Sequence, residues 1–171
     1  MWADEWKYSN ILKNMEKIKA VIFDLDGTLG NTLPLCIQAF RQSVEPLINR
    51  SISDAEIIAT FGPSEEGTTN ISLKHFDLTH FFKIIETGSP SGARKSEGIQ
   101  TILNSLKGLE INEVIYVGDA LSDILASRKV RVPIVAAAWA DTAEPEKLKE
   151  LQPDELFYTI KDFKNWLLDR I

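Results

Sequence analysis

The sequence has few of the residues on which several classes of protein depend. Its one cysteine, Cys36, cannot form a disulfide within the chain, so the sequence is compatible with a reducing compartment. No apolar run reaches the roughly 18 residues that a membrane-spanning helix needs. The first 19 residues contain acids and tryptophans in place of the basic and apolar regions of a signal peptide. We therefore expect a cytoplasmic protein that does not bind a membrane.

Basic clusters are also scarce. The chain has 19 Lys and Arg against 25 Asp and Glu, which gives a net charge of −6. Binding to a nucleic acid backbone relies on clustered cations, and pairs such as Arg128-Lys129 are too small to track a duplex. Nucleic acid is therefore not the expected partner. A length of 171 residues with 44% apolar residues suits one compact domain or a core with a small appendage.

Short apolar runs alternate along the chain with segments of helical periodicity. Runs rich in β-branched residues predict strands, and apolar residues three or four apart predict helices. This alternation is typical of an α/β fold with a doubly wound parallel sheet covered on both faces. The predicted strands are 20–24, 83–87, 113–117 and 133–138, with a weaker candidate near 156–160. The predicted helices are 4–17, 37–48, 69–76, 99–106 with Ser96 as N-cap, and shorter ones near 122–125, 148–151 and 163–167.

Two of the predicted strands end in acids. Asp24 and Asp26 follow the first, and Asp119 and Asp123 follow the third. Ligands of open parallel sheets bind beyond the carboxyl ends of the strands, where these four carboxylates would converge. Each close pair would repel by roughly 4 kcal/mol at an effective dielectric constant near 20, so the cluster needs a cation, and oxygen ligands favour magnesium. The alternative is that each acid caps a helix or turn, and the paired pattern favours the metal site.

These motifs resemble those of a known family. DLDGTL at 24–29 and GDALSD at 118–123 are similar to the first and fourth motifs of haloacid dehalogenase-like hydrolases, and Lys95 falls where their third-motif lysine is expected. The resemblance covers most of 19–168 and points to phosphoglycolate-phosphatase-like members. It implies a Rossmann-like core and magnesium-dependent hydrolysis of a phosphate monoester, with a small phosphorylated metabolite as substrate.

The resemblance also implies a role for each site residue. Asp24 would attack phosphorus and form an aspartyl-phosphate. Asp26 would act first as general acid and then as general base for the hydrolytic water. Lys95 would neutralise phosphate charge and orient Asp24. The implied magnesium ligands are the Asp24 carboxylate, the Asp26 backbone carbonyl, Asp119 and Asp123, and the implied phosphate-binding residues are Gly27, Thr28 and Lys95.

The family's second motif, a Ser or Thr at the end of another core strand, has no evident counterpart. Only 30–82 separate the first motif from the next predicted strand, which is short for a helical cap, a core helix and a further strand. One interpretation, which we favour, is a truncated cap that leaves an incomplete sheet. The other is a substitute strand over 57–61, with Thr60 or Ser64 as phosphate binder. The favoured interpretation divides the chain into an N-terminal helical extension (1–18), a core (19–32 and 68–171) and a reduced helical cap (33–67).

Two other functions remain open at this point. Loss of the second motif would suit a non-catalytic or impaired binding protein. The same site would also serve a phosphotransferase such as a sugar-phosphate mutase, because cap residues select the acceptor. An incomplete sheet would leave an exposed edge, which favours a homodimer. His75, His80 and Trp139 are interpreted as surface or packing residues.

Overall fold

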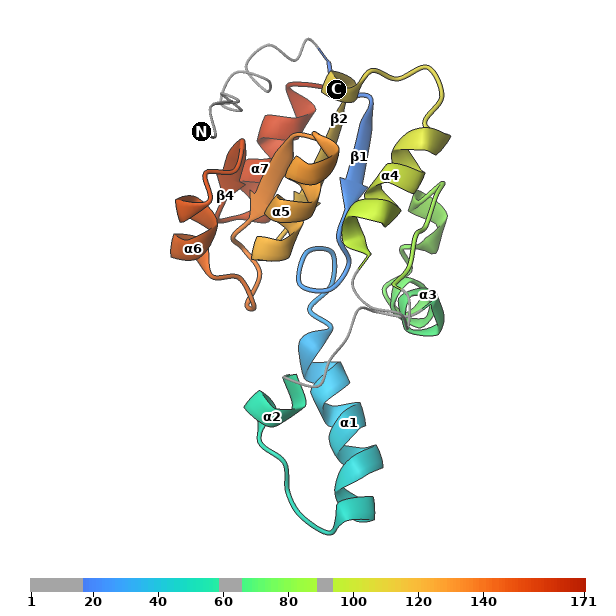
Figure 1. Ribbon diagram of the computed structural model, residues 1–171, viewed down its shortest axis with the longest axis vertical. Helices are drawn as coiled ribbons and strands as arrows, with labels where there is room; N and C mark the ends of the chain where they lie inside the picture. Colours follow the sequence, from blue (N-terminus) through green and yellow to red (C-terminus); the bar gives the residue numbers. More distant parts are fainter. Residues whose placement is uncertain (1–16, 59–65, 89–93) are drawn as a thin grey trace, which may run out of the picture.

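The computed structural model describes residues 17–58, 66–88 and 94–171, so the predicted helix over 4–17 lies outside this part except for its last residue. The described sheet has four parallel strands in the order β1-β2-β3-β4 (Figure 1). Phe23 pairs with Val117 in the register of β1 and β2, so both strands end at the same edge. The strands are β1 (Ala20–Phe23), β2 (Val114–Gly118), β3 (Ile134–Ala137) and β4 (Glu155–Phe157).

Helices cover both faces of this sheet. One apolar cluster includes Tyr116 of β2 together with Ile99 and Ile124 from two helices on the first face. The other cluster includes Val117 of β2 and Phe163 from the last helix. Because successive side chains of a strand point to opposite faces, β2 contributes to both clusters and is buried throughout. The helices of the first face are α4 (Lys95–Ser105), α5 (Leu121–Val130) and α6 (Pro145–Glu150), and that of the second face is α7 (Ile160–Leu168).

A helical segment extends from the carboxyl edge of the sheet. Figure 1 shows α1 (Leu33–Ile48) and α2 (Asp54–Ile58) projecting away from the layers, beyond the end of β1. No residue of α1 is buried, whereas Ile57 of α2 is fully buried. The helix α3 (Glu66–His75) leads back to the core, where the Phe76 ring lies against Gly30 in the loop after β1. This helical segment lies where a cap is expected. The division of the chain into cap and core stays a prediction.

Two of the predicted elements differ from the structure. Residues 83–87 are not a strand, although their sequence is rich in β-branched residues. A strand needs a neighbour to satisfy its N–H and C=O groups, and the described sheet holds no strand beside β1 other than β2. The substitute strand is wrong for Ile57 and Ile58, which end helix α2, whereas Thr60 and Ser64 lie outside the described residues.

Two boundaries differ for local reasons. Helix α4 begins at Lys95 with Arg94 as N-cap, because the Arg94 carbonyl already accepts hydrogen bonds from the N–H groups of Glu97 and Gly98; Ser96 is therefore not the cap. The last strand ends at Phe157, before the predicted 160, because the Thr159 hydroxyl accepts a hydrogen bond from the Asp162 N–H and starts α7.

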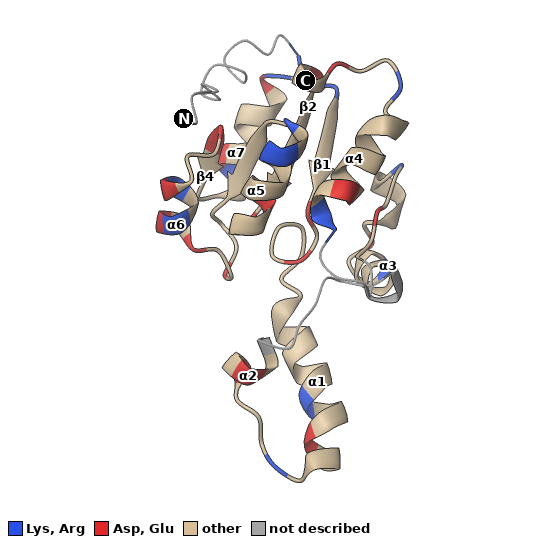
Figure 2. Ribbon diagram, viewed as in Figure 1, with Lys and Arg blue, Asp and Glu red and all other residues tan. Residues whose placement is uncertain are grey.

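Charge is spread over the surface of the described elements. Figure 2 shows Lys and Arg on α1, α4, α5 and α6, in most cases on the same elements as acids. Within the described ranges, no helix is both long and apolar enough to cross a bilayer.

Candidate active site

Three carboxylates meet at the carboxyl edge of the sheet. Asp24 follows β1 directly, and its N–H donates to the Val117 carbonyl over 2.8 Å, which continues the β1–β2 ladder by one residue. The loop and helix after β2 supply Asp119 and Asp123. One carboxylate oxygen from each of the three acids lies within 4.8 Å of the others. The predicted convergence of the two motifs is confirmed for these three side chains.

Asp119 is fixed by two hydroxyl groups. Thr28 Oγ1 donates to Asp119 Oδ1 over 2.8 Å, and Thr142 Oγ1 donates to Oδ2 over 2.9 Å. Burial raises the pKa of Asp119, and the two hydroxyl hydrogen bonds oppose that shift only in part. Gly27, at φ +87°, leaves the space that this arrangement needs, because a Cβ there would lie 2.3 Å from Asp119 Oδ2. The turn within the first motif is therefore shaped around Asp119.

Lys95 connects the other two acids. It is the first residue of α4, where the helix dipole disfavours a cation, yet its ammonium forms ion pairs with Asp123 Oδ1 and, at 3.3 Å, with Asp24 Oδ1. Burial alone would lower the pKa of Lys95, but the carboxylates of Asp24 and Asp123 outweigh it and raise the pKa. Lys95 is thus a cation at neutral pH.

The negative charge of the three acids is not balanced by the chain alone. Burial, followed by the negative charge of Asp123 and then that of Asp119, raises the pKa of Asp24 to about 7, although Lys95 opposes the shift. One lysine faces three carboxylates. Hard oxygen donors at this spacing fit a divalent cation such as Mg²⁺, which would restore the balance and keep Asp24 ionised.

Asp26 is placed differently from the other acids. Its carboxylate does not belong to the group of three described above. Asp26 Oδ1 accepts a hydrogen bond from Thr32 Oγ1 over 2.6 Å, and its backbone forms an isolated bridge with Gly30. Four converging carboxylates were predicted, and the structure brings together three. The roles of Asp26 as general acid and as backbone ligand, and those of Gly27 and Thr28 toward phosphate, stay predictions.

Residues that the sequence interpretation did not assign to the site also contact it. Thr142 lies in the loop after β3, so the rule that sites form beyond strand ends would have located it. Trp139 packs on Phe163 at a centroid distance of 5.4 Å, as a packing residue should, but its Nε1 also donates to the Thr28 carbonyl over 3.3 Å. Tyr116 donates to Asp123 over 2.9 Å, a contact that nothing in the local sequence indicates.

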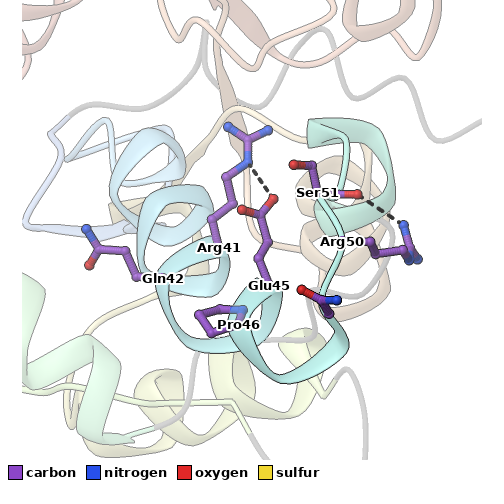
Figure 3. Close-up of a pocket in the computed structure, with 7 residues that line it drawn as sticks. Arg41, Gln42, Glu45, Pro46, Arg50 and Ser51 are labelled. Atoms are coloured by element: carbon purple, nitrogen blue, oxygen red, sulfur yellow. Dashed lines mark hydrogen bonds and ion pairs between the residues drawn. The ribbon is translucent and has the colours of Figure 1, made fainter.

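A hollow of about 510 Å³ lies at the far end of α1, away from these acids (Figure 3). Its basic side chains are already paired within the chain. Arg41 contacts Asp54 and Glu45, and Arg50 contacts Glu56. The hollow therefore offers no unpaired cation for a phosphate. Its lining residues are Arg41, Gln42, Glu45, Pro46, Asn49, Arg50 and Ser51.

Comparisons with known proteins bear on the family and the fold. The model of the family described as haloacid dehalogenase-like hydrolase matches residues 21–71 and 64–137. A pyrophosphatase PpaX from Listeria welshimeri is 25% identical, over 85% of this chain and 94% of the relative. A phosphoglycolate phosphatase from Agrobacterium fabrum is 33% identical over 48% of this chain and 35% of the relative. A haloacid dehalogenase-like hydrolase structure from Streptococcus pneumoniae has a TM-score of 0.71 at 18% identity, covering 87% and 98% of the two chains.

The comparisons also bear on the length of the chain. The alignment with the Listeria pyrophosphatase runs over 207 positions, more than the 171 residues of the whole chain. The relative therefore carries segments that this chain lacks. The family model matches in two pieces that overlap at 64–71, around the predicted boundary between the reduced cap (33–67) and the second part of the core (68–171).

Proposed function

Because this chain belongs to the haloacid dehalogenase-like hydrolase family, we propose that it is a magnesium-dependent phosphatase that hydrolyses a small-molecule phosphate monoester through an aspartyl-phosphate on Asp24. The observation that carries this proposal is the meeting of three carboxylates and one lysine ammonium at the carboxyl edge of the sheet. Relatives named as phosphatases support the reaction class.

The first chemical step forms one bond and breaks another. An Asp24 carboxylate oxygen attacks phosphorus, and the bond from phosphorus to the ester oxygen breaks. Asp26 gives its proton to the departing oxygen, so the product leaves as an alcohol. Lys95, a cation next to Asp24, offsets negative charge on the phosphoryl oxygens as they approach.

The second step restores the enzyme. Asp26, now ionised, takes a proton from a water molecule, and the resulting oxygen attacks phosphorus. The bond between phosphorus and Asp24 breaks, which releases inorganic phosphate and regenerates the Asp24 carboxylate. The Thr32 hydroxyl orients Asp26 through its 2.6 Å hydrogen bond in both steps.

The proposed metal ligands are the carboxylates of Asp24, Asp119 and Asp123 and the backbone carbonyl of Asp26. When bound there, Mg²⁺ supplies positive charge to the phosphate oxygens. Asp24 then belongs both to the metal site and to the reacting group.

The two other functions are less favoured. A binding protein without activity would not need the retained set of acids and lysine in contact. A sugar-phosphate mutase would need cap residues that hold a second phosphorylated molecule, and the helical segment beyond β1 is short. Both remain outcomes of the experiment below.

We expect the purified chain to release phosphate from p-nitrophenyl phosphate with Mg²⁺, and EDTA to reduce the rate by more than about 100-fold, because one lysine cannot balance three acids and a phosphate. Phosphoglycolate and inorganic pyrophosphate are assayed in parallel. Pyrophosphate as the only substrate would contradict the monoester proposal. No release from any of them would favour the binding protein, and faster turnover with an added sugar phosphate than with water would favour the mutase.

Thr142→Val should weaken Mg²⁺ binding by about tenfold, because Asp119 is then oriented by the Thr28 hydroxyl alone. The measurement is the Mg²⁺ concentration that gives half of the thermal stabilisation, with no substrate present. Thr142→Ser should restore binding, since it keeps the hydroxyl. Thr101→Val, on the exposed face of α4, is the matched control. Equal Mg²⁺ affinity for Thr142→Val and wild type would contradict a role of Thr142 in orienting Asp119 for the metal.

A further inference from the structure

Tyr116 carries a hydroxyl group that its packing does not require. The side chain is 3% exposed and lies in the apolar cluster that β2 shares with α4 and α5. Phenylalanine would fill the same space. A buried hydroxyl costs free energy unless it is hydrogen-bonded, so its partner indicates what it is for.

That partner is Asp123, the acid that also holds Lys95. Tyr116 Oη donates to Asp123 Oδ1 over 2.9 Å, and the Lys95 ammonium contacts the same oxygen. The Ala120 N–H donates to Oδ2 over 2.8 Å. Asp123 is 0% exposed, so the protein must supply its hydrogen bonds.

The strand β2 supports Asp123 at two neighbouring positions on one face. Tyr116 donates the hydrogen bond, and Gly118, two residues further on, leaves room for the carboxylate. A Cβ at Gly118 would lie 2.4 Å from Asp123 Cγ. The buried strand therefore sets both the place and the orientation of this acid.

The contacts form a chain from the middle of the sheet to the proposed nucleophile. Tyr116 contacts Asp123, Asp123 contacts Lys95, and Lys95 Nζ lies 3.3 Å from Asp24 Oδ1. The ammonium is shared between two carboxylates. When Asp123 loses one of its hydrogen-bond donors, its carboxylate attracts the Lys95 ammonium more strongly. The ammonium then interacts less with Asp24 and with a bound phosphate.

We propose that the Tyr116 hydroxyl is a positioning group for Lys95, acting through Asp123, and that it tunes the affinity of the site for the phosphate group. The proposal rests on the phosphatase function above. Tyr116 does not touch the reacting atoms, so its effect is on phosphate binding and not on the identity of the nucleophile.

The test compares Tyr116→Phe with Tyr158→Phe, which removes the hydroxyl of a tyrosine that is 54% exposed. With p-nitrophenyl phosphate and Mg²⁺, Tyr116→Phe should lower kcat/KM by about tenfold, mostly through KM. Calorimetry with inorganic phosphate and Mg²⁺ should show a rise of similar size in Kd, without any turnover. Tyr158→Phe should match the wild type in both measurements.

The outcomes distinguish a failure of the Tyr116 proposal from a failure of the proposed phosphatase function. A lower melting temperature for Tyr116→Phe with unchanged KM and phosphate Kd would mean that the hydroxyl only stabilises the fold, and would overturn the positioning role alone. A wild-type chain that neither hydrolyses the ester nor binds phosphate would overturn the phosphatase function, and the role of Tyr116 with it.

Discussion

Asp24→Asn should reduce the release of phosphate from p-nitrophenyl phosphate by more than about 1,000-fold, since an amide cannot form the covalent intermediate. The substitution keeps the size of the side chain and its place after β1, so substrate binding should change far less than turnover. The measurement is steady-state hydrolysis with saturating Mg²⁺. Asp169→Asn, at the exposed end of α7, is the matched control and should retain full activity. Residual activity above a tenth of the wild-type rate would contradict Asp24 as nucleophile.

Asp24→Asn should also change the pH dependence of the stability of the metal-free protein. The pKa of Asp24 is raised from 3.8 to about 7 by burial and by neighbouring acids, so the folded state holds this proton more tightly than the unfolded state. The stabilisation that results is complete below a pH of about 4 and is lost as pH rises through about 7. An asparagine has no proton to lose. In EDTA, Asp24→Asn should therefore melt at a higher temperature than wild type at pH 8, and Mg²⁺ should reduce this difference.

Lys95→Met should lower kcat/KM by about 100- to 1,000-fold, the range seen when one group that stabilises transition-state charge is removed. It should also destabilise the fold by about 3 kcal/mol, the low end for breaking a buried ion pair, because about a third of the Lys95 side chain is exposed whereas Asp123 is fully buried. Chemical unfolding in EDTA measures the second effect. Lys147→Met removes an exposed lysine that pairs with Glu144, and it should change neither quantity.

A second substitution distinguishes the two effects of Lys95→Met. The double variant Lys95→Met/Asp123→Asn no longer holds a buried charge without a partner, so its stability should return toward that of wild type. Its activity should stay low, because the cation near Asp24 is still missing. Stability that is unchanged in Lys95→Met would show that Asp123 does not depend on this lysine. Recovery of activity in the double variant would show that Lys95 acts only on the fold.

The parts of the site that could be predicted from the sequence are those carried by short segments. Asp24 and Asp119 each follow an apolar strand, and the register of a parallel sheet then places both at one edge. The contacts that orient them join residues far apart in the chain, as Thr28 does with Asp119 and Thr142 does with the same acid. No local pattern encodes such pairs, because they depend on how strands are ordered and how loops end.

The error at 83–87 has the same origin. A run such as Ile84-Ile85 has the composition of a strand, but a strand exists only when another strand completes its hydrogen bonds. The described sheet holds no second strand beside β1 that could complete the hydrogen bonds of 83–87. Composition thus indicated a preference that the described sheet does not satisfy.

The position of β1 at the end of the sheet has a consequence for local opening. Its hydrogen bonds in the described sheet run to β2 alone, along four paired residues from Ala20 to Phe23. Detaching this strand breaks one ladder, whereas detaching β2 would break two. A ligand that binds both Asp24 and Asp119 would link the segment after β1 to the segment after β2. Ligand binding would then make detachment of β1 less frequent, and detachment of β1 would weaken ligand binding.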